Sequence, residues 1–446
     1  MAKNNHDDEL IKIRTYEKKE KVKKEKPKKE KAPKKEKRSK PKNVPRANGV
    51  KLDFKKEEPE VNRYYMAVSK RYRSARYLAV VLLVIYLLVM LIFYRENITY
   101  ANFVYLARDL DSDTQLNIGE YSDITYERSF DSDYALFRSR IAVASPTGFA
   151  LYSSTGSKDL ESRDVLSDPR LETSEKYAVM YSAGERDYSV FTSIARVFHG
   201  ECEFEIEDCA VSDTGRYALL TRNDEARFLV TVYNDSFKTL AEYYEDKFVL
   251  DVALDSEGEN IAIASQNITG SDILGEISLG KVGTKESTTL SFEGMMPIYV
   301  SYADDGKLVV LFDQGIKIFD GEDEVASISF GGLAPGYFQM EKNIIAISFP
   351  TNVMGSENSL KVYNTTGEEL YNETIGTKLV CVATDGAEAV YAVGETRAYC
   401  LDMTDGKLYE ESLSHQALDA IAVPGSLVIC TPDGTASYFT EDKTEP

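Results

Sequence analysis

Residues 208–244 read DCAVSDTGRYALLTRNDEARFLVTVYNDSFKTLAEYY, and this stretch contains the repeating unit of the chain. Four short runs rich in Val, Leu, Ala, Phe and Tyr alternate with turns. The first turn contains Asp213 and Gly215. Both residue types are typical of tight turns, because Asp binds nearby backbone N–H groups and Gly tolerates a positive φ. The stretch therefore predicts four antiparallel strands joined by tight turns and hairpins.

The same unit recurs in the C-terminal part of the chain. Its clearest further copies are LDVALDSEGENIAIASQN from residue 250, YVSYADDGKLVVLFDQGIKIFDGEDEVASI from residue 299 and VCVATDGAEAVYAVGETRAYCLDMTDGKLYEESL from residue 380. The turn glycines Gly215, Gly258 and Gly306 lie 43 and 48 residues apart, and Gly386 lies 80 residues beyond Gly306. Four strands repeated at this period are typical of β-propeller blades.

Counting hairpins divides residues 131–440 into eight units. They span 131–165, 166–203, 204–245, 246–290, 291–329, 330–374, 375–411 and 412–440. The last unit supplies only three strands, whereas an unassigned strand, Asp123–Phe130, precedes the first. If that strand completes the last blade, the ring closes and no open edge remains. We therefore predict an all-β, eight-bladed propeller over residues 122–440. Seven blades, an open solenoid and a β-sandwich are the alternatives.

The stretch Tyr77–Tyr94 (YLAVVLLVIYLLVMLIFY) contains no charged residue. As a helix rising ~1.5 Å per residue it would cover roughly 27 Å, close to the thickness of the hydrocarbon core of a bilayer. Arg76 and Arg95 flank it and can reach the headgroups. We predict a single transmembrane helix with the lipid bilayer as its partner; a buried helix of a soluble protein is the alternative.

Charge is distributed unevenly on the two sides of this stretch. Residues 1–76 contain 27 Lys and Arg against 12 Asp and Glu, whereas residues 77–446 contain 26 against 61. The positive-inside rule then predicts a cell-membrane protein with a cytoplasmic N-terminus and an extracytoplasmic C-terminal domain. A cleavable signal peptide is a poorer interpretation, because its n-region would be 76 residues long.

The basic tail, residues 1–76, is expected to be disordered. It has too few apolar residues to offset the entropy of ordering. Glu is interleaved with Lys throughout the basic run, and no nucleic-acid-binding module accompanies it, so we expect no nucleic acid as a partner.

Residues 95–121 are expected to be a juxtamembrane linker. Within it, Asp109–Glu120 (DLDSDTQLNIGE) places carboxylates at positions 1, 3, 5 and 12, the spacing of an EF-hand calcium loop. Position 6 is Thr114, where that loop requires Gly, and no clear helix follows. An acidic linker is the preferred interpretation, and calcium binding by this loop stays open.

The combination of a Lys-rich tail, one apolar helix and a propeller resembles uncharacterised membrane-anchored β-propeller proteins of Gram-positive bacteria. Over residues 122–440 the repeats are similar to WD-repeat and quinoprotein-type propellers. The chain has no Trp, so it lacks both the Trp-Asp pair of WD repeats and the tryptophan docking motifs of quinone-dependent dehydrogenases. The resemblance implies a fold but no activity and no cofactor.

We find no catalytic motif in the sequence, and predict no catalytic, cofactor-binding or metal-binding residues. His199 and His415 are the histidines outside the tail, and neither has a nucleophile motif nearby. Cys202 and Cys209 flank one connection between units and could form a disulfide outside the cell. An odd number of cysteines favours free thiols, and their pairing stays open.

Several carboxylates accompany the repeats, namely Asp213, Asp251, Asp255, Asp304, Asp305 and Asp385. Recurrence at equivalent positions favours a structural role in turns. The alternative is a pair of acids at the centre of the ring, the arrangement by which glycosidases protonate a leaving group and activate water. Several acids at the centre but outside the turns would favour that alternative.

These observations favour a non-enzymatic function. We predict a propeller held outside the membrane as a platform for a protein or cell-envelope partner, with the excess of acidic residues favouring a basic partner. The alternative is a ligand- or glycan-binding protein, or an enzyme, that uses acids at the centre of the ring. Signal transmission to the tail would require a partner for Asp7–Lys24.

Overall fold

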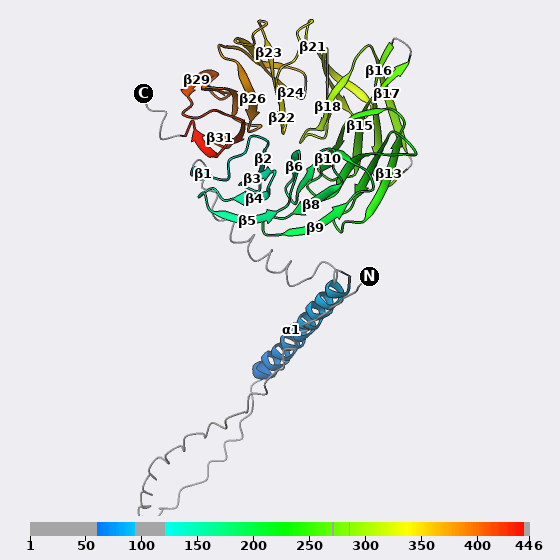
Figure 1. Cartoon of the computed structure of the whole chain (residues 1–446). Coiled ribbons are helices and arrows are strands. Elements are labelled where there is room, and N and C mark those ends of the chain that lie inside the picture. Colours follow the sequence, from blue (N-terminus) through cyan, green and yellow to red (C-terminus); the bar gives the residue numbers. More distant parts are fainter. Residues whose placement is uncertain (1–59, 94–120, 270–271, 285, 441–446) are drawn as a thin grey trace, which may run out of the picture. The chain divides into compact units, whose positions relative to one another are not determined.

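The computed structural model describes residues 60–93, 121–269, 272–284 and 286–440 (Figure 1). They belong to two compact units, residues 1–93 and residues 94–446. The tail residues 1–59 lie outside the described residues, as does the linker with its Asp109–Glu120 loop, apart from Tyr121.

The first unit contains one helix, α1 (Glu60–Phe93), of 34 residues. It includes residues 77–93 of the predicted membrane segment and begins earlier, within the stretch assigned to a disordered tail. Helix propagation is easier than nucleation, so residues 60–76, which are rich in Arg and contain no Gly or Pro, can continue a helix N-terminally. The side chains of residues 87–94 lie outside the described part. Among the residues that the structure describes, no helix is both long enough and apolar enough to span a membrane.

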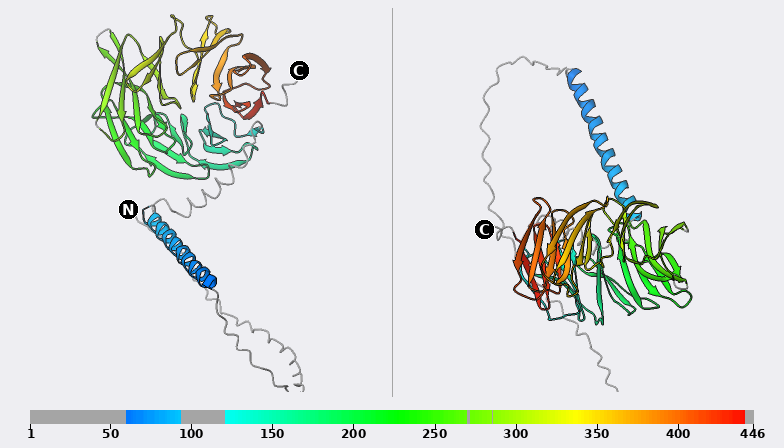
Figure 2. Two further views of the ribbon diagram at one scale, coloured as in Figure 1. Left: turned by 180° about the vertical axis from the view of Figure 1, so that it is seen from behind. Right: turned by 90° about the horizontal axis from the view of Figure 1, so that it is seen from above.

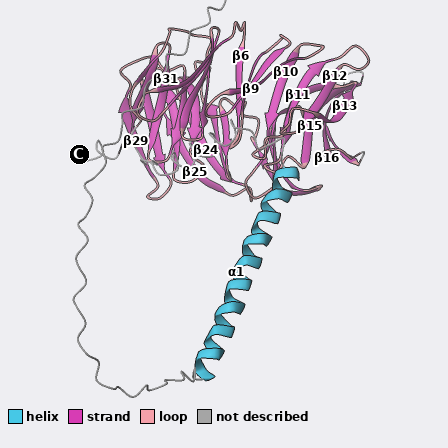
Figure 3. Ribbon diagram, turned by 90° about the horizontal axis from the view of Figure 1, so that it is seen from below, coloured by secondary structure: helices cyan, strands magenta, loops and turns pink. Residues whose placement is uncertain are grey.

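The second unit is a ring of eight four-stranded antiparallel sheets (Figures 1 and 2). This confirms the eight-bladed propeller and excludes the seven-bladed, solenoid and sandwich alternatives. Between residues 121 and 440, apart from the three undescribed positions, the structure has strands and connections but no helix (Figure 3).

Seven of the blades are made from four consecutive strands each. The first is β2 (Asp133–Phe137), β3 (Arg140–Ser145), β4 (Gly148–Tyr152) and β5 (Lys158–Arg163). The second is β6 (Pro169–Thr173), β7 (Ala178–Ser182), β8 (Asp187–Phe191) and β9 (Arg196–Glu201). The third is β10 (Ile206–Val211), β11 (Tyr217–Arg222), β12 (Phe228–Tyr233) and β13 (Thr239–Glu245). The fourth is β14 (Phe248–Leu254), β15 (Asn260–Thr269), β16 (Asp272–Lys281) and β17 (Ser287–Glu293). The fifth is β18 (Pro297–Tyr302), β19 (Leu308–Phe312), β20 (Gly315–Asp320) and β21 (Asp323–Ser329). The sixth is β22 (Phe338–Glu341), β23 (Ile344–Pro350), β24 (Asn358–Asn364) and β25 (Glu369–Ile375). The seventh is β26 (Leu379–Thr384), β27 (Ala389–Gly394), β28 (Arg397–Asp402) and β29 (Lys407–Ser412).

The eighth blade joins the two ends of the propeller. Its first three strands are β30 (Asp419–Val423), β31 (Ser426–Thr431) and β32 (Gly434–Tyr438), and its outer strand is β1 (Ile124–Thr125) from before the first blade. Ile124 pairs with Thr435 and Thr125 with Gly434. Tyr126 Oη lies 2.7 Å from the carbonyl oxygens of both Thr431 and Gly434. The predicted closure by an N-terminal strand is therefore confirmed.

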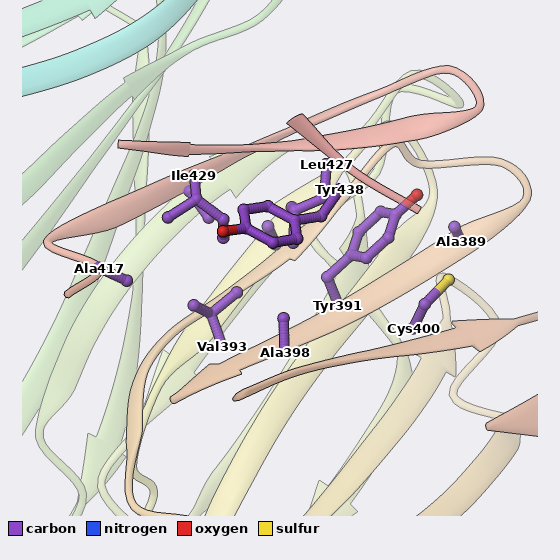
Figure 4. Packing of buried hydrophobic residues seen from close by; sticks show 11 residues of the cluster. Ala389, Tyr391, Val393, Ala398, Cys400, Ala417, Leu427, Ile429 and Tyr438 are labelled. Carbon is purple, nitrogen blue, oxygen red and sulfur yellow. The ribbon is translucent and has the colours of Figure 1, made fainter. Parts of the chain in front are cut away.

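Burial within each blade explains its sequence pattern. Second strands such as β7, β19 and β27 are buried along their whole length, because both faces pack against other blades, and they read as continuous apolar runs. Outer strands such as β17 alternate exposed and half-buried residues. The hydrophobic clusters lie between neighbouring blades. In the cluster between the seventh and eighth blades, the rings of Tyr391 and Tyr438 lie among Val393, Leu427 and Ile429 (Figure 4).

The turn between the first and second strands repeats the predicted chemistry. Asp255 Oδ1 accepts the N–H groups of Glu259 and Asn260, and Gly258 has a φ of +64°. Asp385 Oδ1 accepts three successive N–H groups, from residues 387 to 389. Asp213, Asp304 and Asp305 also lie in turns. Five of the six carboxylates named from the sequence thus have the expected structural placement.

Candidate functional site

Asp251 departs from the turn assignment. It lies in the middle of β14, the innermost strand of the fourth blade. Innermost strands surround the centre of the ring, as β2, β6, β10, β18, β22 and β26 show in Figure 1. Six further carboxylates lie on innermost strands, namely Asp133, Glu172, Glu207, Asp208, Glu341 and Asp419. The centre of the ring is therefore acidic, and these acids lie outside the repeated turns.

Three of these acids bind backbone N–H groups of the following blade. Asp133 Oδ2 accepts from Leu171 at 2.8 Å, and Asp251 Oδ2 accepts from Val300 at 2.6 Å. Asp208 Oδ2 accepts from Val252 at 3.3 Å. An innermost strand has one edge without a neighbouring strand, so its N–H groups on that edge need other acceptors. The carboxylates supply them and link successive blades.

Four innermost strands contain a β-bulge next to this position. The register shifts between residues 206 and 208 in β10, 249 and 251 in β14, 297 and 299 in β18, and 379 and 381 in β26. A bulge adds a residue opposite a single partner and re-aims the side chains beside it. In β14 and β18 the extra residues are Leu250 and Ile298, and both are exposed.

Asp208 and Asp251 lie on neighbouring innermost strands, β10 and β14. Both carboxyls accept from the Val252 N–H, Asp208 through Oδ2 at 3.3 Å and Asp251 through Oδ1 at 2.9 Å. Burial raises the pKa of both, and the negative charge of Asp208 raises the pKa of Asp251 further.

Glu172 and Asp419 also have raised pKa values. Burial, together with the charges of Asp208 and Asp133, raises the pKa of Glu172 to about 8. The Glu172 side chain is exposed to solvent, so repulsion by the carboxylates of Asp208 and Asp133 favours its protonated form more than burial does. Among the described residues, no hydrogen bond or ion pair of the Glu172 carboxylate is found. Burial raises the pKa of Asp419 to about 6, with a smaller contribution from Asp133.

A cavity of about 930 Å³ opens over the third, fourth and fifth blades. Asp208, Asp251 and Tyr299 line it from the innermost strands. It lies on the face of the ring at which each innermost strand begins, which we call the start face. The turns between second and third strands lie on the same face, since antiparallel neighbours run in opposite directions.

The rim of this cavity exposes large apolar side chains. The exposed fractions are 44% for Phe248, 40% for Leu250 and 40% for Ile298. The β15–β16 hairpin extends beyond Phe248 on the start face, because Phe248 pairs with Gln266, and its end exposes Ile268 and Ile273. Apolar side chains gathered around a cavity are typical of binding surfaces.

The structure does not assemble the other residues considered from the sequence into a reactive site. His199 lies in β9, not in a connection, and its Nδ1 is 3.1 Å from Ser189 Oγ. No carboxylate in the described part of the chain hydrogen-bonds His199, so a triad is not formed there. Cys202 and Cys209 are free thiols, as are the other three cysteines. Over the described ranges, no group of three or more His, Cys, Asp or Glu residues is arranged to hold a metal ion.

We expect Asp251→Ala to lower the free energy of unfolding by about 1–3 kcal/mol, because the Val300 N–H would lose its acceptor. Asp251→Asn should cost less than about 1 kcal/mol, since its Oδ1 still accepts. Urea unfolding of both variants, with the exposed turn variant Asp304→Ala as control, measures this. Equal stability of Asp251→Ala and Asp251→Asn would contradict a bridging role.

The comparisons with known proteins agree with the fold. The sequence profile of a family of unknown function, DUF5711, matches residues 116–437. No curated protein matches the sequence. Among solved structures, Sqt1 of Saccharomyces cerevisiae has a TM-score of 0.51 at 10% identity, covering 72% of this chain and 99% of that chain. Hydrazine synthase of Kuenenia stuttgartiensis has 0.44 at 12% identity, covering 63% and 99%. Apo AztD of Citrobacter koseri has 0.45 at 10% identity, covering 69% and 89%. At 10% identity, the likeness to Sqt1 concerns the fold alone.

Proposed function

This chain belongs to the DUF5711 family, whose function is unknown, and we propose that it is a non-enzymatic binding module that docks a protein partner on the start face of its propeller. The observation that supports this most directly is the exposed apolar rim formed by Phe248, Leu250 and Ile298 around the cavity. Exposing such side chains to water is unfavourable unless a partner covers them.

The architecture also suits a docking role. Eight blades held together by apolar clusters and by carboxylate-to-backbone bonds give a rigid support, and connections from all blades meet on two broad faces. Most central acids are already bound to backbone N–H groups, as Asp133 and Asp251 are, so their first role is to join blades. This favours docking over catalysis at the centre of the ring.

We further propose that the module is anchored in the cell membrane through Tyr77–Tyr94 and faces the extracytoplasmic side. The support is the uncharged eighteen-residue stretch and the basic residues concentrated before it. The partner is then a protein of the cell envelope.

The test is crosslinking of the full-length chain on intact cells with a membrane-impermeant reagent, followed by mass spectrometry. We expect one recurrent envelope partner, recovered about tenfold less with the double variant Leu250→Ser/Ile298→Ser. The matched control, Leu240→Ser/Val325→Ser, changes two equally exposed apolar residues on outer strands and should leave recovery unchanged. Equal recovery with both double variants would contradict docking at this rim. If the reagent does not label the propeller on intact cells, that result would contradict the proposed extracytoplasmic position of the propeller.

A further inference from the structure

The chemistry of the cavity over the third to fifth blades indicates what kind of partner segment it accepts. Its volume of about 930 Å³ lies within the range of roughly 300–1,000 Å³ found for ligand sites. It has room for a few side chains of a partner, and it combines apolar walls with charged groups.

The apolar walls come from two sources. Phe228 and Phe248 lie at the ends of β12 and β14 that border the cavity, with their ring centroids 6.5 Å apart. Leu250 and Ile298 face outward because the bulges in β14 and β18 remove them from the regular alternation. Flat aromatic and branched aliphatic groups of this kind suit the methylene chain of a long side chain.

The charges of the cavity are predominantly negative. Its carboxylates are Glu205, Glu207, Asp208, Asp224 and Asp251, against the guanidinium groups of Arg222 and Arg227. Both guanidinium groups are already engaged. Arg222 Nε contacts Glu207 Oε1 at 2.5 Å, and the Arg227 guanidinium lies over the Phe248 ring, 4.3 Å from its centroid. The lining therefore contains more carboxylates than guanidinium groups, and both guanidinium groups already have a partner.

Arg227 also shows how a cation is accommodated at this rim. Its guanidinium stacks on an aromatic face next to carboxylates, a geometry that attracts cations electrostatically. Deeper in the same cavity, the carboxyls of Asp208 and Asp251 both accept from the Val252 N–H and so lie side by side. A cation placed beside them meets two carboxyl groups at once and favours their ionised forms.

We propose that this cavity binds a basic and aliphatic segment of the partner, an inference that rests on the proposed docking function. A Lys or Arg side chain of that segment lies along Phe248, Leu250 and Ile298. Its positive charge lies at Asp208 and Asp251. Charge complementarity selects this occupant over an acidic or purely apolar segment. The start face thereby recognises a cationic side chain by an apolar wall and an acidic base.

The test uses the full-length chain in neutral detergent and calorimetric titration with the peptide acetyl-Gly-Leu-Lys-Leu-Lys-Gly-amide. Two counterparts replace either both Lys by Glu or both Leu by Ser. We expect the Leu-Lys peptide to bind at least tenfold more tightly than either counterpart. Equal binding of the Glu counterpart, or no binding of the Leu-Lys peptide up to millimolar concentration, would overturn the proposal.

A pair of matched variants locates the binding. Asp251→Asn removes one of the two carboxyl groups at the base of the cavity but keeps an acceptor for Val300, and we expect at least a tenfold loss of affinity for the Leu-Lys peptide. Asp133→Asn is the control, because Asp133 binds Leu171 in the same way without lining the cavity, and it should change affinity less than twofold. Equal losses in the two variants would overturn the proposed site.

Failure of this inference is distinguishable from failure of the docking function. The partner could require Leu250 and Ile298 for crosslinking while the wild-type chain does not bind the Leu-Lys peptide. That result would support docking at the rim and overturn the proposal that the bound segment is basic.

Discussion

Ile124→Asp is expected to lower the free energy of unfolding by roughly 3–5 kcal/mol and to open the ring at the eighth blade. The Ile124 side chain is only 2% exposed and lies in the apolar cluster between the eighth and first blades, so a carboxylate there would be buried without a partner. β1 is held by only two ladder pairs, so its detachment leaves β32 as an open edge. Urea unfolding and hydrogen exchange of the β32 amides measure the two effects.

The chain offers a matched control for this result. Ile328 occupies the equivalent position in β21. Ile124 precedes Thr125, which pairs with Gly434, and Ile328 precedes Ser329, which pairs with Gly315. Ile328→Asp should also destabilise the fold, but β21 follows β20 directly, so the β32 amides should keep their protection. Persistent protection of β32 in Ile124→Asp would contradict the role of β1 in closure.

The repeat made the architecture predictable from the sequence. Strand and turn composition depend on neighbouring residues, so units such as residues 204–245 could be recognised one by one. Closure by β1 was also predictable, because a final unit of three strands needs one more to remove its open edge. The N-terminal extent of α1 was not, since residues 60–76 have no regular spacing of apolar residues and become helical next to an apolar stretch.

The candidate site was largely hidden from the sequence. Asp133, Asp208, Asp251 and Asp419 each precede a short apolar run, and that recurrence was the available signal. The backbone partners of Asp133, Asp208 and Asp251 in the following blade lie about forty to fifty residues along the chain, and no local pattern shows such contacts. The bulges that expose Leu250 and Ile298 are equally invisible, because each adds a single residue to a strand whose composition is ordinary.

The wild-type propeller is expected to lose stability between about pH 4 and pH 7. Burial raises the pKa of Asp419 from its ordinary 3.8 to about 6, with a smaller contribution from Asp133, while Cys381 and the Ala420 N–H oppose the rise. Between these values the folded state binds more protons than the unfolded state, so this group's contribution is complete below pH 3.8 and is lost as the pH rises through 6. The loss is about 3 kcal/mol. The raised pKa values of Asp133, Asp208 and Asp251 add to it with the same sign.

Urea unfolding at pH 4, 5.5 and 7 measures this dependence, and Asp419→Asn isolates the contribution of one residue. The amide keeps an acceptor for the Ala420 N–H, which lies 2.8 Å from the present carboxylate, but it does not titrate. The variant should therefore lose less stability than the wild type over this range, by about the same 3 kcal/mol. Asp320→Asn, at an exposed position, should follow the wild-type profile. If Asp419→Asn followed it too, Asp419 would ionise as readily in the folded propeller as in the unfolded chain, and its burial at the centre of the ring would be free of electrostatic cost.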